Sequence, residues 1–345
     1  MSKGFKRQCG LTLVELMVAT TLSLVLLAGV LVVFAANKTT YRMQNGLGTL
    51  QENGRYAMRQ IVNDLQLAGF GGCLSPNLEP KPRVINLVDG SPTYLDEFAG
   101  GQFFAGDDNG GSSYGGAAMS AGTDAIEIRG PLRSSVGYTT GEVNASGNIM
   151  VKGDATGTGG FETNEYLLIS DCAGADILQA TNVQLASGDT AIAHASTGNT
   201  QANLSRAFAA DSVVTAFATH TYFIADTGRD NASGQDITAL YRFDGTSAVE
   251  LVDGVEDLQI EYALDTDGNG RIDAFNDADA LTAVEWSEVT AIRISLLMNS
   301  VEAASAVVAP YTYFPTQSTP ITPDADDFRL RQEFSSLVSV RNAVQ

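Results

Sequence analysis

The sequence predicts an α+β protein in which one long N-terminal helix packs on a mostly antiparallel β-sheet domain. Two observations predict the helix: residues 11–36 form an apolar run, and apolar residues then recur at helical spacing as far as Ala68. A third observation predicts the sheet, because short apolar runs separated by Gly, Asn and Asp fill the chain beyond residue 73. With 345 residues and 44% hydrophobic content, the chain can bury a substantial core.

A short basic leader, residues 1–10, precedes the apolar run and ends at Gly10. No small-residue cleavage site of the secretory type follows the apolar run, so the natural break lies before it. Loss of the leader removes three bases and leaves 40 acids against 17 bases, which changes the formal net charge from −20 to −23.

The first half of the predicted helix, residues 11–36, has the length and composition of a membrane span. Its 21 residues after Glu15 carry no charge and would rise about 31 Å as a helix, enough to cross a bilayer. A carboxylate within such a span costs up to roughly 2.5–3.5 kcal/mol at the membrane centre, so Glu15 is predicted to have a function. The alternative is a plain single-pass anchor in which Glu15 has no role.

The second half, residues 37–70, is predicted to be amphipathic, because most of its apolar residues are three or four positions apart. Gly46, Gly48 and Gly54 each weaken a helix by about 1 kcal/mol relative to Ala, so we expect bending there. The glycine-rich segment 69–72 ends the helix, which would then be about 87 Å long.

The remainder, residues 71–345, is predicted to be a β-rich extracytoplasmic domain. We expect residues 100–122 to be a long loop and the strands to complete one antiparallel sheet. The strands are predicted at residues 125–128, 166–170, 213–217, 221–225, 239–243, 248–252, 255–264, 289–298 and 334–341.

The Gly10–Leu11 junction, followed by Glu15 at the fifth position after it, resembles the type IV pilin signature for cleavage and N-methylation by prepilin peptidase. The family usually has Phe where this chain has Leu11. Similarity to the PilW type of minor pilin extends over the whole chain, in the segments LQENGRYAMRQIVNDLQLAGFGGC (50–73), SDC (170–172), LVDGVEDLQIEYALDTDGNGRID (251–273), WSEVTAIRISLLMNS (286–300) and FRLRQEFSSLVSVRN (328–342).

The resemblance implies a minor pilin that helps to prime pilus assembly at or near the tip. Its implied partners are other minor pilins, the major pilin, the prepilin peptidase, the inner-membrane assembly platform and a tip adhesin. It implies a single-pass inner-membrane protein with a periplasmic domain, which later moves to the pilus. Twitching, DNA uptake and attachment all remain open as roles of the pilus. A minor pseudopilin of type II secretion is the alternative, since it would share the leader, helix and sheet.

Cys73 and Cys172 remain after Cys9 leaves with the leader. Export places them in an oxidising compartment, which favours a disulfide over two buried free thiols. The family pattern also has Cys at both positions, which supports the pairing.

An acidic segment follows the predicted strand 255–264 and fits part of the calcium-loop template. Asp265, Asp267, Asn269 and Asp273 supply oxygens at positions 1, 3, 5 and 9, Gly270 supplies the turn, and Arg271 contributes a backbone carbonyl at position 7. Position 12 is Asn276 instead of the usual bidentate Glu, with Asp277 as the alternative ligand, so the affinity should be weak if calcium binds. The alternative is an acidic turn between strands that binds no metal.

The charge balance argues against nucleic acid as a partner, because phosphate binding needs clustered Lys and Arg.

We do not expect an enzyme. The Gly-Ser-Ser-Tyr-Gly match to a nucleophile elbow at 111–115 has no strand–turn–helix context and no nearby His. An anchored hydrolase or adhesin is a second alternative, and an adhesive role at the tip stays open. His194 and His220 have no metal-ligand spacing and are expected to be solvated or hydrogen-bonded.

Overall fold

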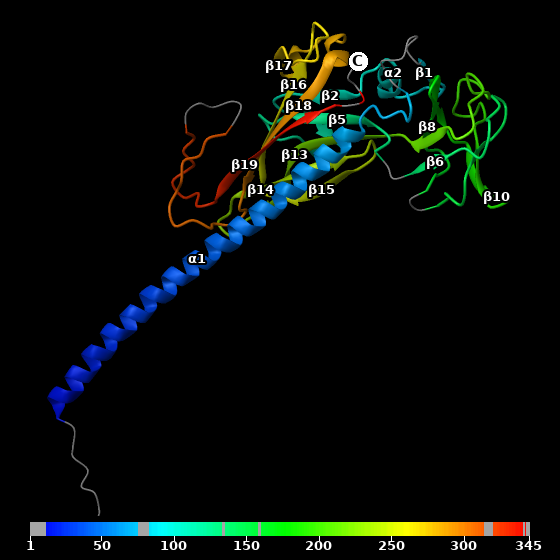
Figure 1. The fold of residues 1–345 in the computed structure, drawn as a ribbon. Helices are drawn as coiled ribbons and strands as arrows, with labels where there is room; N and C mark the ends of the chain where they lie inside the picture. The colour runs from blue at the N-terminus through cyan, green and yellow to red at the C-terminus, as the bar shows by residue number, and fades with distance from the viewer. Residues whose placement is uncertain are drawn as a thin grey trace, which may run out of the picture.

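The predicted α+β fold is confirmed by a computed structural model, which describes residues 12–74, 83–132, 135–157, 160–313, 320–340 and 342. One helix of 55 residues, α1 (Leu13–Leu67), is followed by a β-rich domain (Figure 1). The leader and the Gly10–Leu11 junction lie outside the described residues.

Helix α1 projects from the domain along its N-terminal half and lies across the domain along its C-terminal half (Figure 1). Before Leu50 nearly every residue of α1 is exposed, including all of residues 13–36. Within the described part of the chain, α1 is the one helix that is long and apolar enough to cross a membrane. The buried residues of the C-terminal half share one face of the helix and are Leu50, Gly54, Ala57, Ile61, Asp64 and Leu65.

Helix α1 is continuous through Gly46, Gly48 and Gly54. Gly54 has a packing role: a Cβ atom there would overlap the ring of Phe334. Gly48 faces open space, so a Cβ atom at that position would meet no neighbouring side chain.

Two sheets form the main core under α1. The central sheet has the order β15-β14-β13-β5-β2, and the C-terminal sheet has the order β17-β16-β18-β19. Apolar residues of both sheets and of α1 form one buried cluster. The strands of the central sheet are β2 (Phe104–Asp107), β5 (Ala125–Gly130), β13 (Ala218–Asp230), β14 (Asp236–Phe243) and β15 (Ala248–Asp253); those of the C-terminal sheet are β16 (Val255–Leu264), β17 (Ala274–Asn276), β18 (Val289–Asn299) and β19 (Arg331–Ser339).

A second group of strands lies beyond the C-terminal end of α1 (Figure 1) and has its own buried cluster. Its sheets have the orders β1-β9-β8-β12-β6 and β10-β11-β7, and the short helix α2 (Thr93–Ala99) packs on β8 and β9. The strands are β1 (Arg83–Asn86), β6 (Val136–Tyr138), β7 (Ile149–Val151), β8 (Tyr166–Asp171), β9 (Gly174–Gln179), β10 (Asn182–Ala186), β11 (Asp189–Ala193) and β12 (Val213–Ala216).

Two expectations about the domain are wrong. The described residues form five sheets instead of one, although the pairing is mostly antiparallel as predicted, with β1 parallel to β9. The expected loop at 100–122 contains β2 and the hairpin of β3 (Ser113–Tyr114) and β4 (Ala117–Ala118). The hairpin is held because Tyr114 packs on Phe223, a side-chain contact that local composition does not reveal.

Candidate functional site: the N-terminal helix and its anchors

The exposed N-terminal half of α1 is apolar on every face. Leu13, Leu24 and Phe34 are each more than 60% exposed, although a helix that is apolar all round is normally buried. This segment therefore requires lipid or other apolar helices around it, and Glu15 is its only charged residue between Thr12 and Ala36.

Glu15 closes the first turn of α1 through a capping box. The backbone N–H of Thr12 donates to Glu15 Oε2 at 2.9 Å, and the Glu15 N–H donates to Thr12 Oγ1 at 3.2 Å. Both residues are exposed, so the carboxylate is held by local donors that a stronger donor from another chain could replace. Thr12 directly follows Leu11, where cleavage would create a free α-amino group.

A buried acid on α1 anchors the helix to the domain. Asp64 Oδ2 lies 2.6 Å from Nδ1 of His220 and accepts a hydrogen bond of 2.6 Å from the Tyr222 hydroxyl. Both partners lie on β13, and burial together with the nearby Asp64 carboxylate raises the pKa of Tyr222. His220 is thus a hydrogen-bonded strand residue, and sequence reasoning missed the anchor. Its one local signal is an acid within the apolar stripe of a helix.

The disulfide between Cys73 and Cys172 is present, with a Cα–Cα distance of 4.9 Å and a sequence separation of 99. Cys73 directly follows the glycine-rich end of α1, and Cys172 lies in the turn between β8 and β9. The bond therefore ties the end of the helix to the second group of strands.

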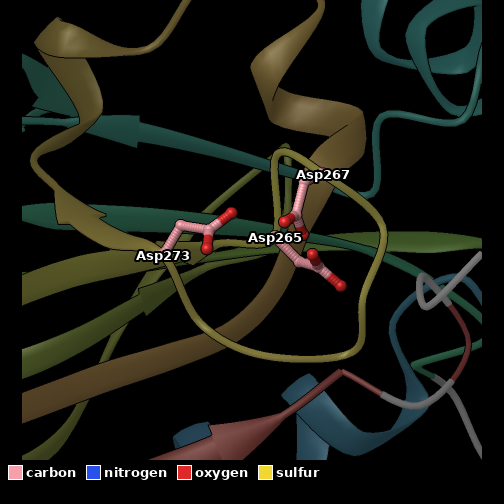
Figure 2. Close-up of side chains that lie close together, drawn as sticks. All are labelled: Asp265, Asp267 and Asp273. Carbon is pink, nitrogen blue, oxygen red and sulfur yellow. The ribbon is translucent and has the colours of Figure 1, made fainter.

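The acidic loop connects the paired strands β16 and β17, and its three aspartates converge (Figure 2). One carboxylate oxygen from each of Asp265, Asp267 and Asp273 lies within 4.8 Å of the others. Hydrogen bonds from the hydroxyl and backbone N–H of Thr266 hold the pKa of Asp273 below its usual value, which keeps that group ionised.

The backbone of the loop already turns around these carboxylates. The N–H groups of Asn269 and Gly270 donate to Asp265 at 3.1 and 2.7 Å, and the Arg271 N–H donates to the Asn269 side-chain oxygen at 2.9 Å. Three anionic oxygen ligands suit a hard cation such as Ca²⁺. Asn276, at the twelfth position, lies on β17 and pairs with Tyr262 of β16.

Two family models match parts of the chain. Residues 5–31 match the model described as the prokaryotic N-terminal methylation motif, a span that contains Gly10, Leu11 and Glu15. With this motif at the start of a long apolar helix, the chain is similar to type IV pilins. Residues 221–342, which include β13 to β19, match the model described as type IV pilus-assembly protein W. The predicted resemblance to PilW-type minor pilins is therefore confirmed, and this match does not favour a type II pseudopilin.

A solved structure, the type IV-like pilin TTHA1219 from Thermus thermophilus, is 15% identical to the chain. The alignment covers 53% of this chain and 87% of that chain, with a TM-score of 0.20, which adds no argument about the fold. No curated protein matches the chain. Pilins of this class are structural subunits that are processed by prepilin peptidase and assemble with other pilus components.

Proposed function

We propose that the protein helps to initiate type IV pilus assembly and stays at or near the pilus tip. The observation that supports this proposal is an exposed apolar helix half whose only charge is Glu15, close to the predicted cleavage junction. Such a helix gains stability only among lipids or other helices. The chain would be cut between Gly10 and Leu11, methylated at Leu11, and held in the inner membrane with its β-rich domain in the periplasm.

In the assembling fibre, Glu15 would pair with the free α-amino group of a neighbouring subunit. The pair fixes the axial position of the helix, because any other stagger leaves a carboxylate alone in an apolar bundle at a cost of several kcal/mol. The proposed neighbours are other minor pilins and the major pilin, with the assembly platform below and a tip adhesin above. The function is then to set register and shape, without catalysis.

The test is a count of surface pili in a clean deletion strain, with and without a block of pilus retraction. We expect few pili in the deletion strain and their return when retraction is blocked, because priming limits initiation. A strain that makes normal pili but traps an exported enzyme in the periplasm would contradict this proposal and favour a secretion pseudopilin.

A second proposed function is weak calcium binding by Asp265, Asp267, Asn269, Arg271 and Asp273. It rests on the convergence of three carboxylates in a loop of the template sequence. Millimolar Ca²⁺ should raise the melting temperature of the full chain in detergent, and Asp265→Ala should abolish that rise. Asp211→Ala, at an exposed acid far away in sequence, is the control. An equal rise in both variants, or none in the wild type, would reject the site.

A further inference from the structure

The face of α1 that points away from the domain carries exposed arginine and tyrosine side chains, although the chain as a whole is acidic. Glu52, Arg55, Tyr56, Arg59 and Asn63 are all exposed. Each lies three or four positions from another member of the set, so they form one stripe along the helix. The buried stripe that contains Leu50, Ala57 and Ile61 lies on the other side of the helix. The outward stripe therefore lies on the side of the helix opposite the buried residues that pack on the β-rich domain.

The charge of the stripe is opposite to that of the rest of the protein. Helix α1 carries four bases, Lys38, Arg42, Arg55 and Arg59, whereas the chain beyond residue 70 has 37 acids and 13 bases, a net charge of −24. None of the four bases forms an ion pair with another described residue. Glu52 is the one acid between them and is not paired with either arginine among the described residues.

Contact with lipid headgroups cannot explain the positive charge of Arg55 and Arg59, the two arginines nearest the domain. At about 1.5 Å per residue beyond Ala36, Lys38 and Arg42 lie about 3 and 9 Å from the end of the apolar run. This places them near the headgroup layer, which extends about 5–8 Å on each side of the hydrocarbon core. Arg55 and Arg59 lie about 29 and 35 Å away along a helix normal to the membrane, too far to contact headgroups.

We propose that Arg55, Tyr56 and Arg59 form a docking face for the acidic globular domain of a neighbouring pilin subunit. The face combines the residue types that dominate binding energy at protein interfaces, an exposed Tyr between two Arg. Two strongly acidic domains repel each other, whereas a basic helix face attracts such a domain and fixes its orientation. The inference rests on the proposed assembly into a fibre and adds the chemistry of the partner surface.

The test uses the full chain in cells that make pili, with a photo-crosslinking amino acid in place of Tyr56. We expect a crosslink to a pilin subunit, and we expect its yield to fall at least about tenfold when Arg55→Glu and Arg59→Glu are combined. The pair Arg55→Lys and Arg59→Lys should keep most of the yield. Arg83→Glu, at an exposed base on β1, reverses one charge elsewhere on the protein and should leave the yield unchanged. Formation of the Cys73–Cys172 disulfide checks the folding of each variant.

The docking face is rejected if the crosslink goes to phospholipid, if none forms, or if its yield is the same after charge reversal. A crosslinked partner surface that is basic would also reject it. The crosslinking test of the docking face and the deletion test of the proposed function can give different results. A charge-dependent crosslink in a system whose deletion strain keeps normal pili would retain the docking face and overturn priming, and the reverse pattern would overturn the docking face alone.

Discussion

At the scale of the residue, Asp64 has the clearest structural consequence. It is 9% exposed and accepts from Tyr222 while facing His220, so it joins α1 to β13 at the centre of the core. Asp64→Asn keeps the size of the side chain but replaces the carboxylate with an uncharged amide, whose oxygen is a weaker hydrogen-bond acceptor. We expect a loss of about 1–3 kcal/mol in the free energy of unfolding, measured by denaturant titration of the full chain in detergent.

Glu52→Gln is the matched control, because Glu52 is an exposed acid on the opposite side of the same helix. Its effect should stay within about 0.5 kcal/mol. Equal effects of the two substitutions would mean that the buried anchor contributes nothing to docking of the helix.

The residues of the N-terminal motif could be predicted from sequence because their chemistry is local. A Gly junction, an apolar run and one acid stand within a few positions of one another. Asp64 could not be predicted in the same way, since its partners lie 156 and 158 residues away and only the tertiary fold brings them together.

At the scale of the element, alanine substitutions at two glycines of α1 distinguish the cost of overpacking from the gain in helix propensity. Gly54→Ala should destabilise the protein, because the new methyl group would overlap the Phe334 ring of β19 inside a close-packed core. A cost of about 1–3 kcal/mol is expected from thermal unfolding. Combining Gly54→Ala with Phe334→Leu should recover part of this loss.

Gly48→Ala is the control for propensity, since nothing lies within 4 Å of its added methyl group. It should stabilise α1 by up to about 1 kcal/mol. If both alanines stabilised the protein equally, the close approach of Phe334 to the helix would be wrong.

Strand prediction succeeded where the strand is rich in β-branched and aromatic residues. β14, β16 and β18 have such sequences. The bounds of β16 and β18 were predicted to within one residue, whereas β14 begins three residues before its predicted start. β9, with Gly-Ala-Asp at its start, and the short β1 were missed, because neighbouring strands stabilise them more than their own composition does. The helix α2 is only seven residues long and depends on packing on β8 and β9.

At the scale of the whole molecule, the disulfide joins two parts that have separate buried clusters. Replacing Cys73 and Cys172 together by Ser should lower stability, by up to roughly 4–5 kcal/mol in the chain-entropy model, because the bond closes a loop of about 100 residues. Thermal unfolding of the double variant and of the reduced wild type measures this. A melt unchanged by both treatments would contradict a stabilising role.

The pH dependence of stability should reflect buried acids between the two main sheets. Asp124 accepts the Ile260 N–H at 2.9 Å, and burial raises its pKa to about 7; burial likewise raises the pKa of Asp257 to about 6. Because the unfolded values lie near 4, the folded state binds more protons between about pH 4 and pH 7. This contribution is fully present below pH 4 and is lost as the pH rises to 7.

We therefore expect a higher melting temperature at pH 5.5 than at pH 8, with a difference on the order of 2 kcal/mol in stability. Burial raises the pKa of Asp327, but hydrogen bonds from Arg329 and Arg331 outweigh it and hold the pKa below its usual value, so stability falls again in strong acid. Asp124→Asn should flatten the slope between pH 5.5 and 8. A wild-type melting temperature that is constant or rises over that interval would contradict the assignment.

The most direct test of the central claim is the position of the protein on isolated pili. A small epitope in an exposed turn of the β-rich domain, such as residues 186–189, can be located by immunogold labelling of sheared fibres. A minor pilin that initiates assembly predicts label at one end of each fibre, and Glu15→Ala should remove it. Label along the whole shaft, or unlabelled pili from cells that produce the tagged protein, would contradict the account.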